Sequence, residues 1–127
     1  MDSRRTIAVV EDNKDNRLLI RAILSDFYKI TEYVSAYEAL RGLKSSVPDL
    51  IILDISLPGM DGVELLEQLR TDHRLKSLPV VALTAHAMAG DRERYLSSGF
   101  DEYIAKPIVD EELLLSSIDR LFAKSNL

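Results

Sequence analysis

The sequence predicts an α/β fold in which a doubly wound parallel sheet of five strands is covered by five helices. Short apolar or β-branched runs alternate along the chain with longer segments whose apolar residues recur at helical spacing. The run from Leu50 to Leu53 has four consecutive aliphatic residues, as a strand covered on both faces requires. Each connection between strands is long enough for a helix, and helical crossovers join parallel strands.

Composition limits the function classes. The chain has 127 residues, so we expect a single domain over 1–127. It contains no Cys, which excludes disulfides and thiol chemistry. There is no long apolar run and no signal peptide pattern at the start, so we expect a cytoplasmic protein without membrane insertion. The net charge of -5 gives no electrostatic basis for direct nucleic-acid binding.

The first predicted strand, Thr6 to Glu11, ends in two acids, Glu11 and Asp12. A helix is predicted over the following segment, KDNRLLIRAILSDF, because its apolar residues share one face. That face comprises Leu19, Ile20, Ile23, Leu24 and Phe27. The second predicted strand runs from Tyr28 to Val34.

Ser35 and Glu38 fit a capping box, which predicts the start of a second helix. The third strand then ends at Asp54, before a turn formed by Pro58 to Gly62. Asp61 and Glu64 have the same capping spacing at the start of a third helix.

Pro79 introduces a fourth strand that ends at Thr84. A fourth, weakly patterned helix is expected from Met88 to Ser98, with Gly99 at its C-terminal end. The fifth strand, Glu102 to Lys106, ends in a cation. The last helix is predicted from Asp110 to Lys124.

Polar side chains follow four of the predicted strands: Glu11 with Asp12, Asp54, Thr84 and Lys106. The carboxyl ends of parallel strands share one edge of a sheet, where such folds bind ligands. Three carboxylates there repel one another unless a cation neutralises them, and an all-oxygen cluster suits Mg²⁺. An aspartate among these groups can act as a nucleophile toward a phosphoryl group. Asp54 by itself is equally compatible with a residue that caps a turn.

On these motifs the whole chain resembles the receiver domains of two-component response regulators. The resemblance covers the following segments: Glu11-Asp12, DISLPGMDG around Asp54, Thr84-Ala85, and Lys106-Pro107 preceded by Tyr103. It implies a flavodoxin-like sheet with strand order 2-1-3-4-5. It also implies that Asp54 accepts a phosphoryl group from a histidine kinase or a histidine phosphotransfer protein.

The resemblance further implies how the metal is bound. Asp12 and Asp54 would contact Mg²⁺ directly, and Glu11 would do so through water. The backbone carbonyl of Ser56 would complete the protein ligands. Glu11 stands where many relatives have Asp, which lengthens the reach to the metal and keeps the charge.

The remaining implied roles concern the phosphate. Thr84 and the backbone of Ala85 would bind phosphoryl oxygens, and Lys106 would pair with the phosphate. Thr84 and Tyr103 would couple phosphorylation to a surface that binds a downstream protein, although Tyr103 also fits a partly buried strand aromatic. We expect the Lys106-Pro107 peptide to be cis, because Lys106 must point back over the strand ends while the chain turns toward the last helix.

Ser56 and His86 flank the expected site, so we expect them to set the lifetime of the aspartyl phosphate. A solvated loop histidine is the alternative for His86. The segments EDNKDN, LTAHAM and YIAKP resemble receivers of hybrid kinases and phosphorelays more than those of DNA-binding regulators.

Other functions fit the sequence less well. A phosphotransferase of the haloacid dehalogenase type needs a second acid two residues after the nucleophile, where this chain has Ser56. A nucleotide-binding protein would have a Gly-rich loop after the first strand, and EDNKDN contains no glycine. We expect a stand-alone phosphoacceptor that assists its own phosphorylation and is not a turnover enzyme. The alternatives are a docking or dimerisation module that works without phosphorylation, and a receiver segment cut from a hybrid histidine kinase.

Overall fold

The computed structural model describes residues 4–85, 88–108 and 110–125 and contains the predicted alternation of strands and helices. The strands are β1 (Thr6–Val10), β2 (Lys29–Tyr33), β3 (Leu50–Asp54), β4 (Val80–Thr84) and β5 (Glu102–Ala105). The helices are α1 (Lys14–Leu24), α2 (Ala36–Ser45), α3 (Gly62–Thr71), α4 (Asp91–Ser97) and α5 (Glu111–Ser125).

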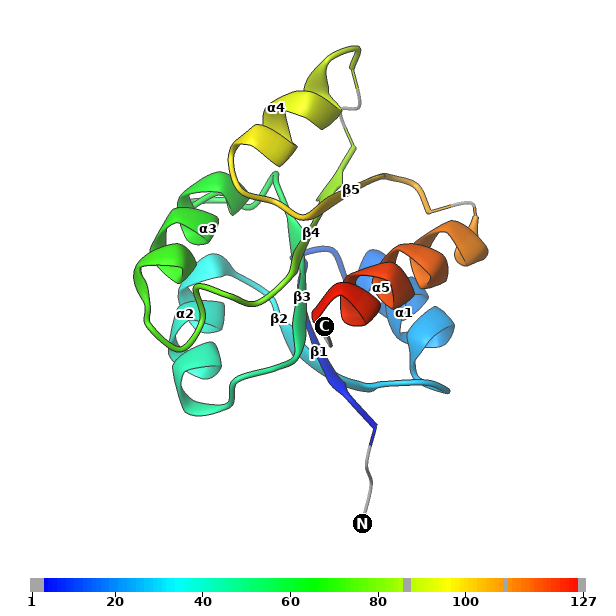
Figure 1. Cartoon of the computed structure of the whole chain (residues 1–127), viewed down its shortest axis with the longest axis horizontal. Coiled ribbons are helices and arrows are strands. Elements are labelled where there is room, and N and C mark those ends of the chain that lie inside the picture. Colours follow the sequence, from blue (N-terminus) through cyan, green and yellow to red (C-terminus); the bar gives the residue numbers. More distant parts are fainter. Residues whose placement is uncertain (1–3, 86–87, 109, 126–127) are drawn as a thin grey trace.

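The strands form one parallel sheet in the order β2-β1-β3-β4-β5, which confirms the predicted fold class. Helices α1 and α5 cover one face, and α2 and α3 cover the other (Figure 1). Helix α4 packs on the same side as α2 and α3 through Tyr95. The sheet therefore separates two hydrophobic clusters, one on each face.

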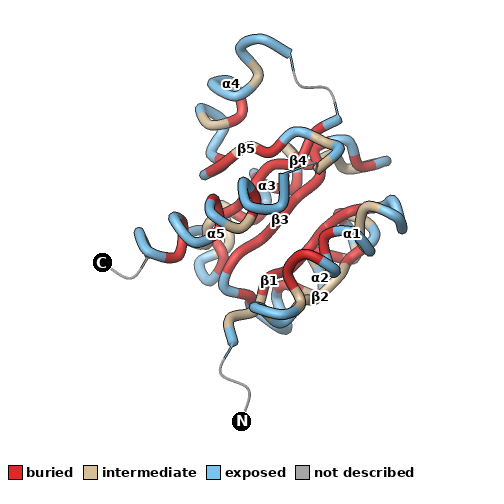
Figure 2. Tube along the Cα trace, turned by 90° about the vertical axis from the view of Figure 1, so that its right-hand side faces the viewer, coloured by how far each residue is buried: buried red, intermediate tan, exposed pale blue. Residues whose placement is uncertain are grey.

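The central strands β3 and β4 are buried along their whole length, as the run of aliphatic residues from Leu50 predicts. Figure 2 shows the buried strands between layers of helices with exposed outer faces. Full burial of one Leu, Ile or Val side chain contributes about 1.5–3 kcal/mol. Asp54 and Thr84 are thus attached to the ends of the best-packed strands in the fold.

Side-chain caps begin four of the helices, α1, α2, α3 and α5; at α5 the Asp110 carboxylate accepts from the Leu113 amide at 3.2 Å. The Ser35 hydroxyl accepts a hydrogen bond from the Glu38 amide at 3.1 Å, and the Asp61 carboxylate accepts one from the Glu64 amide at 2.9 Å. Both starts confirm the predicted capping pairs. Asn13 caps α1 in the same way by accepting from the Asn16 amide at 3.0 Å. These bonds satisfy backbone amides that have no partner within the helix.

The predicted apolar face of the first helix is wrong at its two ends. Leu19 is 37% exposed and Phe27 is 56% exposed, whereas Ile20, Ile23 and Leu24 are buried. Helix α1 ends at Leu24, and the amides of Phe27 and Tyr28 both turn back onto the Leu24 carbonyl. Helical spacing no longer describes the chain beyond that turn, so Phe27 does not reach the core.

Helix α4 is shorter than predicted. It begins at Asp91, because Gly90 precedes it with a left-handed φ of 87°, and Met88 is 74% exposed. Its end agrees with the sequence, since Gly99 follows the helix with a φ of 113° that glycine adopts readily.

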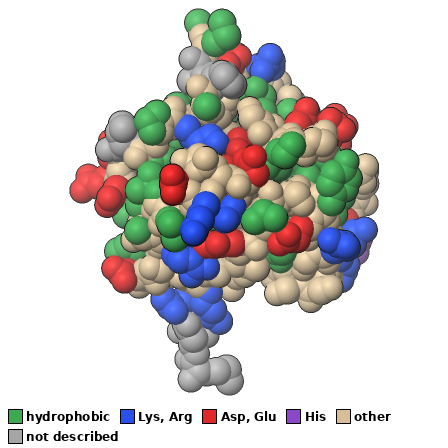
Figure 3. Space-filling view, turned by 180° about the vertical axis from the view of Figure 1, so that it is seen from behind, with side chains coloured by type: hydrophobic (Ala, Val, Ile, Leu, Met, Phe, Trp, Pro, Cys, Tyr) green, Lys and Arg blue, Asp and Glu red, His purple; other side chains and the backbone are tan. Residues whose placement is uncertain are grey.

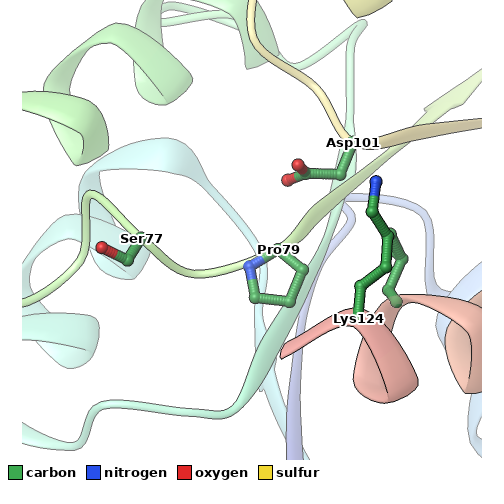
Figure 4. Close-up of a pocket in the computed structure, with 5 residues that line it drawn as sticks. Ser77, Pro79, Asp101 and Lys124 are labelled. Carbon is green, nitrogen blue, oxygen red and sulfur yellow. The ribbon is translucent and has the colours of Figure 1, made fainter. Parts of the chain in front are cut away.

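Hydrophobic, acidic and basic side chains are interspersed on the face of the molecule seen in Figure 3. A cavity of about 150 Å³ is lined by Ser77, Pro79, Asp101, Leu121 and Lys124 (Figure 4). It lies where β4 and β5 begin, at the sheet edge opposite the carboxyl ends of the strands. None of the described helices has the length and apolar character that crossing a membrane requires.

Gly62, the first residue of α3, lies directly against the backbone of Asp54. A Cβ atom at this position would come within 2.5 Å of the Asp54 carbonyl oxygen and 2.7 Å of the Ile55 Cα. We therefore predict that Gly62→Ala lowers the free energy of unfolding by about 1–3 kcal/mol, since backbone has to move. Urea denaturation measures this. Gln68→Ala, at an exposed position of the same helix, should change it by less than about 0.5 kcal/mol; equal effects would contradict the close-packing argument.

Candidate functional site

The carboxyl ends of four adjacent strands carry the polar side chains singled out in the sequence. Asp54 and Thr84 are the last residues of β3 and β4, and Glu11 and Lys106 directly follow β1 and β5. The register pairs Asp54 with Leu83 and Thr84 with Ala105, so neighbouring strands end at one level. The parallel sheet thus brings these four side chains to one edge.

Three acids form a cluster at this edge. Glu11, Asp12 and Asp54 each offer a carboxylate oxygen, and these atoms lie within 4.8 Å of one another. Glu11 and Asp54 are buried, whereas Asp12 is exposed and opens the cluster to solvent. Clustered carboxylate oxygens with access to water are suited to Mg²⁺, which prefers oxygen ligands and retains several waters. The donor set therefore fits this ion.

Lys106 contacts both buried acids. Its Nζ donates to Glu11 Oε1 at 2.9 Å and to Asp54 Oδ2 at 3.0 Å. The lysine comes from β5, while its partners come from β1 and β3. One cation thus compensates part of the negative charge and ties three strands together at the site.

The other carboxylate oxygens accept backbone hydrogen bonds. Asp54 Oδ1 accepts from the Ser56 amide at 3.0 Å, and Glu11 Oε2 accepts from the Asn13 amide at 3.1 Å. Both oxygens of Glu11 and both oxygens of Asp54 therefore have partners. These contacts fix the directions of the two buried carboxylates, whereas Asp12 remains at the solvent side.

The ionisation of the site reflects its burial. Desolvation raises the pKa of Glu11, and the nearby Asp54 acts in the same direction, against the hydrogen bonds from Lys106 and Asn13. Desolvation lowers the pKa of Lys106, but its hydrogen bonds to Glu11 and Asp54 outweigh this and raise that pKa overall. Lys106 is consequently charged at neutral pH.

Three further residues predicted for the site lie at or just after the ends of β3 and β4: Ser56, Thr84 and Ala85. Thr84 is buried, and its carbonyl accepts from the Lys106 amide at 2.7 Å, which holds the ends of β4 and β5 together. Ser56 and Ala85 are exposed. His86 lies outside the described residues, so the role of Ser56 and His86 in phosphate lifetime stays a prediction. The Lys106-Pro107 peptide is cis, as expected.

Tyr103 lies on β5, and its ring stacks on Tyr95 of α4 with centroids 5.7 Å apart and an interplanar angle of 18°. Arg94 covers the Tyr95 ring and donates to its hydroxyl. Burial raises the pKa of Tyr103, so its hydroxyl is neutral at physiological pH. Within the described part of the chain, this buried hydroxyl has no hydrogen-bond partner. A buried polar group left unpaired costs about 1–3 kcal/mol, so a conformation that supplies a partner is favoured.

The structure adds contacts that the sequence analysis missed. Asn13 contributes its backbone amide to Glu11 as well as its cap to α1. Its position directly before a helix was a usable signal, because Asn is a preferred N-cap residue. Tyr95 had no such signal, since its contact with Tyr103 depends on how α4 packs against β5.

Comparison with known proteins agrees with this geometry. A family model for the response regulator receiver domain matches residues 7–119, a span that contains all the strand ends described above. The chain therefore belongs to the response regulator receiver domain family, a family of phosphoacceptor modules in two-component signalling.

The chain is similar to both free-standing and kinase-borne receivers. It is 40% identical over 105 residues to the polar-differentiation response regulator DivK of Brucella ovis, covering 82% of this chain and 85% of DivK. It is 40% identical over 109 residues to the signal transduction histidine-protein kinase BarA of Shigella flexneri. That match covers 85% of this chain, which spans 12% of BarA.

A solved structure is similar over nearly the whole chain. The receiver domain of the sensor histidine kinase PA1611 from Pseudomonas aeruginosa has a TM-score of 0.86 and 32% identity, and the match covers 95% of this chain and 99% of that one. That crystal structure has a magnesium ion coordinated in its active site cleft.

The acidic cluster predicts opposite effects of Asp12→Asn with and without metal. Without Mg²⁺, the variant should be more stable than the parent, because one of three repelling charges is removed. With Mg²⁺, the parent should gain about 2.7 kcal/mol at a concentration 100 times its dissociation constant, and the variant should lose most of that gain. Thermal unfolding with and without Mg²⁺ measures both effects.

Asp15→Asn provides the matched control, because Asp15 is an exposed acid in the first turn of α1 and is not part of the cluster. It should retain the full increment from Mg²⁺. An undiminished increment in Asp12→Asn would show that the cluster is not the binding site.

Proposed function

We propose that this chain accepts a phosphoryl group from a phosphohistidine onto Asp54, in a reaction that depends on Mg²⁺, and thereby switches a protein-binding surface. The observation that carries the proposal is the contact of Lys106 Nζ with Asp54 and Glu11, beside a third acid that faces solvent. A buried carboxylate next to a cation and an oxygen-rich metal site is what phosphoryl acceptance requires.

We propose the metal ligands as well, with the acidic cluster as their support. Asp12 and Asp54 would contact Mg²⁺ directly, together with the backbone carbonyl of Ser56. Glu11 would reach it through one of the waters that Mg²⁺ retains. Bound Mg²⁺ supplies positive charge that offsets the clustered acids and the charge of the transferring group. The magnesium ion of the PA1611 receiver supports this ion.

The chain's own residues would perform the transfer. A carboxylate oxygen of Asp54 forms the new bond to phosphorus while the phosphorus–nitrogen bond of the donor breaks. The donor imidazole, protonated on its other ring nitrogen, takes the electron pair of that bond and leaves as neutral histidine. Lys106 exchanges its hydrogen bond from the carboxylate to a phosphoryl oxygen. The Thr84 hydroxyl and the Ala85 amide bind the other phosphoryl oxygens at the end of β4. Asp12 is exposed, so we propose that the donor approaches Asp54 from that side.

We also propose the phosphoryl donor, the downstream partner and the compartment. The donor would be a histidine kinase or a histidine phosphotransfer protein in the cytoplasm, and a downstream protein would bind the switched surface. We propose that residues 1–127 act as one receiver domain and do not turn over a separate substrate. The chemistry is the same for a free-standing regulator and for a receiver within a kinase. A docking module that works without phosphorylation would not need Lys106 against two buried acids.

Signal transmission would pass through Thr84 and Tyr103. When the Thr84 hydroxyl moves to a phosphoryl oxygen, space opens that the Tyr103 ring can occupy. Inward movement of Tyr103 would end its stacking on Tyr95 and offer its unpaired hydroxyl a new environment. The contact between α4 and β5 would then change, as expected for a ligand that shifts an existing equilibrium.

Asp54→Asn tests the acceptor. We predict that a small-molecule phosphodonor adds one phosphoryl group to the parent in Mg²⁺ and none to Asp54→Asn, because the amide oxygen is a far weaker nucleophile. Intact-protein mass spectrometry measures the addition, and excess chelator should abolish it.

The control is Asp26→Asn, which alters an exposed acid after α1 and should be labelled like the parent. Full labelling of Asp54→Asn would place the acceptor at another residue and end the proposal.

Thr84→Ala tests the coupling. We predict that a beryllofluoride phosphate mimic shifts backbone amide resonances of α4 and β5 in the parent, and that in Thr84→Ala the shifts stay near the metal site. Two-dimensional amide spectra measure this, with Thr71→Ala at an exposed position of α3 as the control. Shifts confined to the metal site in the parent itself would contradict the coupling.

A further inference from the structure

The side chain of Arg17 contacts the loop that carries two of the three clustered acids. Its Nη1 donates to the backbone carbonyl of Glu11 at 2.9 Å and to that of Asp12 at 3.0 Å. The side chain is only 16% exposed. A single nitrogen atom thus joins two consecutive carbonyls of the loop between β1 and α1.

The guanidinium is itself held in place from β2. Arg17 Nε lies 3.7 Å from Glu32 Oε2, and Glu32 Oε1 accepts from Arg21 Nε at 2.6 Å. Glu32 pairs with Val9 across the sheet, two residues before Glu11. The loop is therefore connected through Arg17 to a neighbouring strand as well as to its own helix.

Helix stability does not explain this arginine. Arg17 lies near the N-terminus of α1, where the helix dipole disfavours a positive charge. Asn13 already caps that end. The favourable contacts of the arginine are those with the two loop carbonyls and with Glu32.

Metal attraction does not explain it either. A positive charge beside the cluster of Glu11, Asp12 and Asp54 repels a cation and weakens its binding. Arg17 can favour Mg²⁺ binding only by fixing the geometry of the loop. The charge effect and the geometric effect therefore have opposite signs, and a measurement can separate them.

We propose that Arg17 is a positioning residue for the metal site. By fixing the carbonyls of Glu11 and Asp12, it keeps their carboxylates pointing toward the same ion as Asp54. This inference rests on the proposed function, because it assigns a role within the same Mg²⁺ site.

The test is a titration with Mg²⁺ alone, followed through the amide resonances of the folded protein. In Arg17→Gln the dissociation constant should rise about tenfold or more, as is typical when a group that orients metal ligands is lost. Arg17→Met should behave in the same way. Met keeps an unbranched side chain that can pack along the helix. Arg17→Met therefore provides a second measurement of the dissociation constant if Arg17→Gln folds poorly.

Arg21→Gln is the matched control. It removes one positive charge from the same helix and one contact with the same glutamate, but Arg21 is not hydrogen-bonded to the loop carbonyls. Its dissociation constant should stay within about twofold of the parent, which is a change of about 0.4 kcal/mol.

The outcomes separate the two claims. A dissociation constant that is unchanged or lower in Arg17→Gln and Arg17→Met, with normal binding in the parent, would overturn the positioning role and leave the proposed function intact. An equal rise in Arg21→Gln would also overturn it, since loss of the loop contacts would not be the cause. Absence of Mg²⁺ binding in the parent would overturn both.

Discussion

The contact of Lys106 with Glu11 and Asp54 is the interaction on which the site depends. The lysine side chain is 11% exposed, and the two acids are 0% and 2% exposed. Removing one partner from such a buried group typically costs about 3–5 kcal/mol, because a charge is left without compensation. The acids repel each other, and the lysine, which is hydrogen-bonded to both, offsets part of that repulsion. The strand order brings the three side chains to the same edge of the sheet.

The elements that carry the site residues differ in how firmly they are packed. Asp54 and Thr84 end the two fully buried strands, and Gly62 packs against the Asp54 backbone. Tyr103 and Tyr95 connect the same edge to α4, which is short and has no side-chain cap at its start. Asp54 is therefore attached to the core, whereas Tyr103 contacts a short helix that lacks the stabilisation of a side-chain cap.

Errors in the sequence interpretation occurred where local spacing was extended past its limits. In the sequence, Phe27 has the spacing of the apolar face of α1, but the helix ends at Leu24 and the chain turns before Phe27. Met88 was assigned to a helix that Gly90 delays until Asp91. By contrast, Ser35 and Asp61 were identified correctly, because a capping pair is a local interaction that needs no knowledge of the tertiary structure.

Sequence patterns alone are enough to predict the alternation of strands and helices, the buried central strands and the chemical character of the strand ends. These features depend on periodicity and on the residue types present at each turn, which are local properties. Tertiary packing establishes which groups meet: Lys106 contacts Glu11 and Asp54, Arg17 reaches the carbonyls of the first loop, and Tyr95 stacks on Tyr103. Partners so far apart in the chain, such as Glu11 and Lys106, become neighbours only through strand order and helix packing, and no local pattern encodes either.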